Sequence, residues 1–188
     1  MAATASATRY VIFSVSGRTL ALPADAVRRF LPLPRLDRPP AAPAVVAGLF
    51  RYQGRAVPVL RLDLLFGFEA APPELYAPLF LTDWDGRPLA LLADLVFNIL
   101  PIPDAELTAA DPSLTFNGCA VATIPHRGPH GGPHDGGTAT VIDPSRLLTE
   151  AEGRLLAAFQ AMADERLARL GAPETADEPA EGTEGTAR

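Results

Sequence analysis

Three histidines lie at four-residue intervals in one segment, a spacing that could hold a metal ion. His126, His130 and His134 occupy the run Pro125–Gly137 (PHRGPHGGPHDGG). Imidazole is a common zinc ligand, and a flexible loop can wrap around an ion. The run is also three copies of Pro-His-x-Gly, which is typical of a tolerant surface loop and offers little support to hold ligands in place. We therefore expect no metal and no cofactor, and a metal-binding sensor built on this loop stays an alternative.

Two carboxylates, Asp25 and Asp94, occupy matching positions in two similar stretches of the chain. Paired carboxylates can perform general acid–base chemistry. Their neighbours supply no nucleophile, metal site or second catalytic group, so we expect them to cap backbone donors or to face water. The chain also has no glycine-rich phosphate loop, nucleophile elbow or zinc-protease motif. We expect no catalytic residues and a protein that is not an enzyme.

The similar stretches are an internal duplication. Gly17–Pro34 (GRTLALPADAVRRFLPLP) matches Gly86–Pro103 (GRPLALLADLVFNILPIP) without a gap at an offset of 69 residues, with 11 of 18 positions identical. A repeat at a fixed offset determines the architecture. Two copies are too few for a solenoid, so the duplication predicts two similar halves around a pseudo-two-fold axis, with a groove between them that could hold partners.

Short β-branched and aromatic runs separated by turn residues predict strands throughout both halves. Five short strands in about 55 residues indicate a small barrel. We predict a mainly β fold of two pseudo-symmetric five-stranded β-barrels, at about 9–66 and 76–148, with exchange of end strands as an option. Thr149 and Glu152 form a capping box that starts an amphipathic helix over 149–170. We expect residues 1–8 and the acidic tail 171–188 to be disordered.

Composition limits the partners. The net charge is −6 and all 16 basic side chains are arginine, a pattern that argues against nucleic-acid binding. No apolar run approaches the roughly 20 residues needed to cross a bilayer, and the first residues lack the apolar core of a signal peptide. A single cysteine excludes an intrachain disulfide. We expect a cytoplasmic protein without direct membrane insertion.

Three segments resemble the CheW-like domain family. Val45–Leu62 (VVAGLFRYQGRAVPVLRL) is similar to the family's signature hairpin, Leu91–Leu100 (LLADLVFNIL) to its VDxVxxVL segment, and Thr140–Leu148 (TVIDPSRLL) to its closing strand and turn. The resemblance covers about residues 9–150. It implies two barrels, a groove that binds the cytoplasmic signalling tip of a chemoreceptor, and barrel-end surfaces that meet the regulatory domain of a CheA-type histidine kinase.

The resemblance also implies a set of site residues, and this chain departs from the family at several of them. Gln53 stands where the family usually has arginine, Arg61 where aspartate is common, and Arg28-Arg29 where glutamate is frequent. These changes add positive charge near the expected partner surface, which predicts a partner different from a standard receptor tip. The partner-binding residues implied by the resemblance are Ala24, Val27, Arg29, Arg51, Gln53 and Leu79.

The resemblance favours a non-enzymatic adaptor that couples chemoreceptors to the kinase and is recruited to membrane receptor arrays. A divergent scaffold or regulator with the same fold and another partner stays open, because the signature hairpin is altered at Gln53.

Overall fold

The computed structural model describes residues 6–40, 42–111, 116–127 and 136–171, and these residues form eleven strands and two α-helices. The first part of the chain contains β1 (Ala7–Val15), β2 (Arg18–Pro23), η1 (Ala24–Ala26), β3 (Arg29–Pro32), β4 (Val46–Tyr52), β5 (Arg55–Arg61) and α1 (Leu62–Leu65). The second part contains β6 (Pro78–Trp84), β7 (Arg87–Leu92), β8 (Leu95–Pro103), η2 (Asp104–Glu106), β9 (Thr108–Ala109), η4 (Phe116–Gly118), β10 (Ala120–Arg127), β11 (Gly136–Ile142), η5 (Pro144–Arg146) and α2 (Glu150–Gly171).

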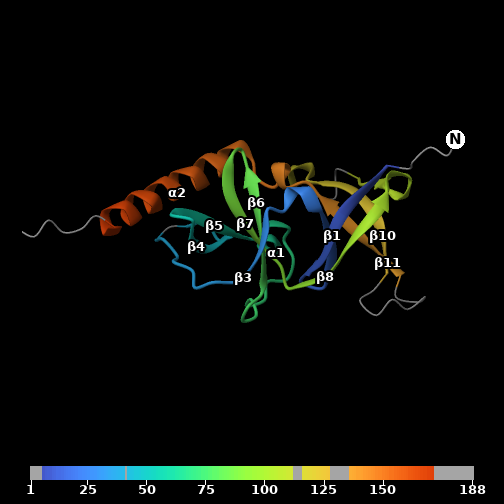
Figure 1. Cartoon of the computed structure of the whole chain (residues 1–188), viewed down its shortest axis with the longest axis horizontal. Helices are drawn as coiled ribbons and strands as arrows, with labels where there is room; N and C mark the ends of the chain where they lie inside the picture. Colours follow the sequence, from blue (N-terminus) through green and yellow to red (C-terminus); the bar gives the residue numbers. More distant parts are fainter. Residues whose placement is uncertain (1–5, 41, 112–115, 128–135, 172–188) are drawn as a thin grey trace, which may run out of the picture.

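The strands form two sheets, and each sheet takes strands from both halves of the sequence (Figure 1). One sheet has the order β8-β1-β2-β11-β10-β9 and the other has the order β3-β6-β7-β5-β4. We call them the six-stranded barrel and the five-stranded barrel. In the five-stranded barrel, the segment between β3 and β4 bridges back to β4. The backbone groups of Asp37 and Leu49 exchange hydrogen bonds of 2.8 and 2.7 Å there.

The mainly β fold with two barrels and one C-terminal helix agrees with the prediction, and the structure shows an exchange of strands, which the predicted barrels at about 9–66 and 76–148 left open. The strand β3 pairs with β6, and β8 pairs with β1, so each half donates its third strand to the other half. The first sheet gains a sixth strand because the chain continues from β8 through η2 into the short β9. At the N-terminus, β1 begins at Ala7, so residues 7 and 8 belong to a strand. Residues 1–5 and 172–188 lie outside the described residues.

The turns explain why the duplication produces matching hairpins. Ser16 and Gly17 have φ of 48° and 72°, and the equivalent Asp85 and Gly86 have φ of 50° and 73°. Two successive residues with positive φ form the type I′ turn, whose twist suits a two-residue hairpin. Glycine at the second position adopts this conformation without a steric penalty. The repeated Ser/Asp-Gly pair therefore starts the same hairpin twice.

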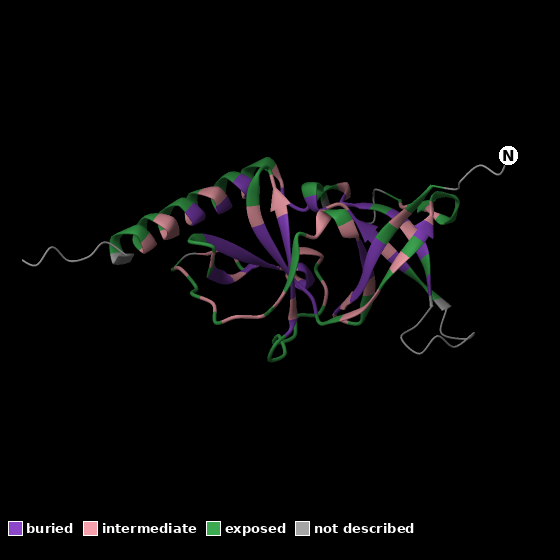
Figure 2. Cartoon of the chain, viewed as in Figure 1, coloured by how far each residue is buried: buried purple, intermediate pink, exposed green. Residues whose placement is uncertain are grey.

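Buried residues run through the strands of both sheets (Figure 2), and their side chains form three hydrophobic clusters. Residues such as Ile12 and Val141 fill the six-stranded barrel, and residues such as Val57 and Leu79 fill the five-stranded barrel. A third and larger cluster lies between the barrels. Its centre is the edge-to-face pair of Phe13 and Phe80, whose ring centroids are 4.7 Å apart. Strands such as β1 and β7 are thus buried on both faces, which explains their continuous apolar sequence.

The helix α2 runs along the five-stranded barrel and extends beyond it (Figure 1). Its predicted capping box is present, because the backbone N–H of Thr149 donates to Glu152 at 2.8 Å and that of Glu152 donates to the Thr149 hydroxyl at 3.2 Å. The predicted apolar stripe is only partly used. Leu156 is buried, whereas Leu155 and Met162 are each 47% exposed.

Polar side chains complete the contact of α2 with the barrel. The amide of Gln160 donates to the carbonyl of Pro88 in β7 at 2.9 Å, and the backbone N–H of Ala56 in β5 donates to the Asp164 carboxylate at 2.5 Å. The paired register of β5 and β7 covers Val59–Arg61 and Ala90–Leu92 only. Gln160 and Asp164 therefore satisfy backbone groups that lie outside this pairing.

Candidate partner-binding surface

One end of the five-stranded barrel opens into a hollow of about 280 Å³. All five strands or their adjoining turns contribute to its wall. The residues that line it are Arg28, Arg29, Tyr52, Gln53, Arg55, Leu81 and Pro88. We call this site the arginine hollow.

Local structure determines how the hairpin between β4 and β5 contributes to the hollow. Gln53 and Gly54 have φ of 49° and 79°, so they form the same type of turn as the hairpins of the duplication. This turn pairs Tyr52 with Arg55 across the hairpin. The half-buried Tyr52 ring lies edge-to-face with Phe50 at 6.4 Å and packs against the barrel interior. Arg55 and Gln53 are exposed.

The arginine hollow carries an excess of positive charge. Arg28 forms an ion pair with Asp83 at 2.7 Å. Within the described part of the chain, Arg29 and Arg55 have no carboxylate within ion-pair distance, and no Asp or Glu lines the hollow. A guanidinium offers five donors in a planar arrangement that suits a carboxylate or a phosphate. The hollow can therefore bind an anionic group.

The structure brings two of the predicted site residues together and separates the others. Arg29 and Gln53 both line the arginine hollow. Arg51 lines a different hollow, between β4 and the second half of α2. Ala24 and Val27 pack against the cluster between the barrels. The prediction for Leu79 is wrong as a surface contact, because this side chain is fully buried inside the five-stranded barrel.

Sequence reasoning did not include three neighbours of Arg29 among the site residues. Arg55 and Tyr52 reach the hollow from the adjacent hairpin. Phe30 follows Arg29 in β3, is 44% exposed, and meets Phe80 edge-to-face at 5.5 Å. Phe30 is therefore an exposed aromatic side chain in contact with Phe80, a member of the cluster between the barrels. A difference between the two repeats could have indicated this site. The repeat equivalents of Arg28 and Arg29 are Phe97 and Asn98, so only the first copy carries the charge.

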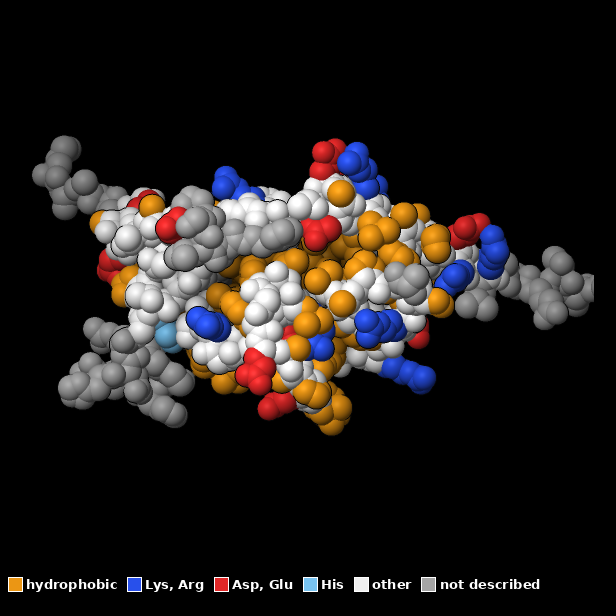
Figure 3. Space-filling view, turned by 180° about the vertical axis from the view of Figure 1, so that it is seen from behind, with side chains coloured by type: hydrophobic (Ala, Val, Ile, Leu, Met, Phe, Trp, Pro, Cys, Tyr) orange, Lys and Arg blue, Asp and Glu red, His pale blue; other side chains and the backbone are white. Residues whose placement is uncertain are grey.

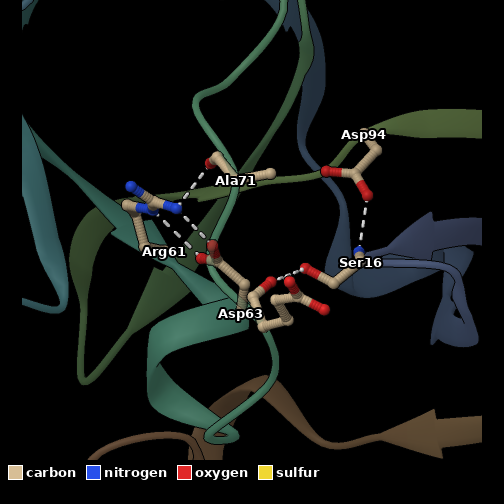
Figure 4. A network of polar contacts seen from close by, with 6 residues as sticks. Ser16, Arg61, Asp63, Ala71 and Asp94 are labelled. Carbon is tan, nitrogen blue, oxygen red and sulfur yellow. Dashed lines mark hydrogen bonds and ion pairs between the residues drawn. The ribbon is translucent and has the colours of Figure 1, made fainter.

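Arg61 does not contribute positive charge to a partner surface, contrary to expectation (Figure 4). Its guanidinium forms an ion pair with Asp63, and a second bond from Nε to Asp63 measures 3.1 Å. It also donates to the carbonyl of Ala71 at 2.7 Å. The hydrogen bond with Asp63 raises the pKa of Arg61. Arg61 therefore anchors the segment that links the two halves.

The same segment is anchored from the other barrel. The Ser16 hydroxyl donates to the carbonyl of Glu69 at 2.8 Å, and the Ser16 N–H donates to the Asp94 carboxylate at 2.5 Å (Figure 4). Asp94 therefore binds a backbone donor, as predicted. Its repeat equivalent Asp25 is exposed in η1. Neither position points to acid–base catalysis.

The histidine segment is described at its two ends, Pro125–Arg127 in β10 and Gly136-Gly137 in β11. His126 is buried and stacks on Phe97, with ring centroids 5.5 Å apart, and burial lowers the pKa of its imidazole. His130 and His134 lie outside the described residues. Over the described ranges, no group of three His, Cys, Asp or Glu side chains could hold a metal ion. Burial of His126 against Phe97 indicates a packing role for this histidine.

No helix among the described residues has the length and apolar character needed to cross a membrane.

Seen from the side opposite to Figure 1, hydrophobic side chains gather over the middle of the molecule (Figure 3).

Comparison with known proteins identifies the fold. The chain is similar to the crystal structure of the scaffolding protein TtCheW from Thermoanaerobacter tengcongensis, with a TM-score of 0.67 and 16% sequence identity over 77% of this chain and 89% of that chain. No curated protein matches the chain. The family model of the CheW-like domain matches residues 9–152, a range that includes both barrels and ends within the first turn of α2. The chain therefore belongs to the CheW-like domain family.

Proposed function

We propose that this protein is a non-enzymatic adaptor that couples chemoreceptors to a CheA-type histidine kinase. The family match over both barrels carries the proposal, and the fold is shared with a protein described as a scaffold. The receptor signalling tip would bind beside Ala24, Val27 and Arg29, and the regulatory domain of the kinase would bind a barrel end. The adaptor would be cytoplasmic and recruited to receptor arrays at the membrane.

The mechanism requires only geometry. An adaptor that holds both partners at once raises the effective concentration of each for the other. The layer between the barrels supports this role, because it holds the two barrels together through large buried side chains such as Phe13 and Phe80. A partner bound to one barrel would then have a defined position relative to a partner on the other.

The second candidate is a scaffold with the same fold and a different partner. The observation that favours it is the arginine hollow, since Arg29 and Gln53 replace the charges that the family usually carries there. Under this alternative the protein would bind neither a receptor tip nor a kinase.

A binding titration separates the two candidates. The full chain is titrated with the regulatory domain of each CheA-type kinase from the same genome and with receptor signalling-tip fragments. Micromolar binding to both classes supports coupling. A variant with an altered barrel-end hairpin, in which Gln53 and Gly54 are replaced by Asp and Pro, is expected to weaken binding, and a variant at the distant Arg9 is the matched control. Absence of binding to any kinase or receptor would favour the second candidate.

A further inference from the structure

We propose that the arginine hollow is a docking site for an acidic segment of a protein partner, whose carboxylates bind Arg29 and Arg55. The inference rests on the proposed function, in which this protein holds another protein, and it names the chemistry of the group that the partner supplies.

Charge pairing in the arginine hollow is incomplete. Of the three guanidiniums in the hollow, that of Arg28 has a carboxylate partner, Asp83 at 2.7 Å. Arg29 and Arg55 have none among the described residues. The chain as a whole is acidic, with 22 Asp and Glu against 16 basic side chains. A local excess of arginine in an acidic protein therefore indicates selective attraction for anions at this place.

The surroundings of the arginines indicate which kind of anion would bind. Asp83 already shows that a carboxylate binds a guanidinium at the edge of this hollow. Leu81, Pro88 and Tyr52 line the hollow together with the arginines, and their apolar and aromatic atoms suit the methylene groups of glutamate side chains. The combination of charge and apolar surface favours a protein segment over a small inorganic anion.

Hydrogen bonds from α2 hold the walls of the hollow in place. Gln160 donates to the carbonyl of Pro88, a residue that lines the hollow, at 2.9 Å. Asp164 accepts from the N–H of Ala56, next to Arg55, at 2.5 Å. The helix α2 thus fixes β5 and β7 where they form the wall. A rigid wall lowers the entropy lost when a partner binds.

The six-stranded barrel lacks arginines at the positions equivalent to Arg28 and Arg29. The repeat equivalents of Arg28 and Arg29 are Phe97 and Asn98, and Phe97 stacks on the buried His126. Aromatic packing therefore takes the place of the arginines at the equivalent position of the six-stranded barrel. The charge is a property of one barrel end and does not follow from the shared fold.

The test uses the full chain and a fluorescein-labelled peptide of six glutamates, with a peptide of six glutamines as the neutral probe. We expect the wild-type protein to bind the glutamate peptide and not the glutamine peptide. The double variant R29Q/R55Q should bind about ten-fold more weakly or worse, because two charge-assisted contacts are lost.

The matched variant R9Q/R35Q removes the same charge from two exposed arginines outside the hollow, and its affinity for the peptide should stay within about two-fold of wild type. The variant R29K/R55K, which keeps the charge, should recover part of the affinity.

Three results would overturn the inference: wild-type affinity in R29Q/R55Q, an equal loss in R9Q/R35Q, or displacement of the peptide by inorganic phosphate when chloride at the same ionic strength does not displace it. The last result would assign the hollow to a free phosphate. Because the probe is a peptide, the outcome does not depend on the kinase or the receptor. If the peptide binds as expected but no kinase or receptor does, the proposed coupling function fails while the acidic docking site stands.

Discussion

The two barrels arise from the same repeat but end in different surfaces. In the six-stranded barrel, Phe97 packs on His126 at the position where the five-stranded barrel has Arg28. In the five-stranded barrel, Arg28 and Arg29 face an open hollow together with Arg55. The identical repeat positions include turn glycines and buried residues such as Leu22 and Leu91. Positions that the duplication kept therefore maintain the fold, and positions that diverged give each barrel its own surface.

The strongest test of this comparison concerns the layer that both barrels share. Phe80→Ala removes a fully buried ring that contacts Phe13. We expect the free energy of unfolding to fall by about 3–5 kcal/mol, because a large core side chain leaves a cavity behind. Urea unfolding measures the loss. The matched variant Phe30→Ala changes a ring that is 44% exposed and should cost clearly less. Equal losses would mean that the shared layer does not hold the barrels together.

A second test concerns α2, which packs against the five-stranded barrel. A Cβ at Gly153 would lie 1.7 Å from Cη2 of Trp84, so Gly153→Ala must displace the ring or the helix. We expect a loss of about 1–3 kcal/mol despite the better helix propensity of alanine. Thermal unfolding followed by Trp84 fluorescence measures it.

The control for this test is Ala158→Gly, which makes the opposite change at an exposed position of the same helix. It should cost about 1 kcal/mol through helix propensity alone. If Gly153→Ala instead stabilises the protein, the close contact between Trp84 and the helix is contradicted.

A third test asks whether the arginine hollow takes part in partner binding. Arg29→Glu reverses the charge of a side chain that lines the hollow. We expect affinity for the partner found in the titration to fall about ten-fold, since a like charge would then face an acidic group. Arg9→Glu reverses an exposed charge on the six-stranded barrel and should leave affinity nearly unchanged. Equal effects would indicate a response to net charge and not to one barrel end.

The smallest expected effect is a pH dependence specific to the six-stranded barrel. Burial lowers the pKa of His126 in the folded state, below the unfolded value of about 6.5. The unfolded chain therefore binds the proton more readily, so the contribution to stability is complete above this pH and is lost as the pH falls toward the folded pKa. Urea unfolding at pH 7.5 and 5.5 should show a smaller difference for His126→Gln than for wild type. An unchanged difference would show that His126 does not titrate with folding.

Several features followed from the sequence alone. The offset repeat predicted two similar halves, and pairs such as Asp85-Gly86 predicted tight hairpins because few residues tolerate positive φ. The capping box at Thr149 placed the start of α2 within one residue. The segment Val45–Leu62 indicated the family. The turn pairs, the capping box and the family segment are local signals, since each depends on residues that are neighbours in the chain, whereas the repeat is found by comparing two stretches 69 residues apart.

The tertiary structure decided what depends on distant pairing. The strands β3 and β8 exchange between the halves, and no local pattern states which sheet a strand joins. The burial of Leu79 could not be predicted from alternation along its strand, because residues on both faces of β6 are buried. The sequence therefore did not show whether Leu79 faces the interior of a barrel or a groove. The ion pair of Arg61 with Asp63 depends on the backbone turn from β5 into α1, which the sequence pattern did not indicate. Arg29 and Arg55 line one hollow although they lie on β3 and β5, which are not neighbours in the sheet, and this proximity exists only in the folded chain.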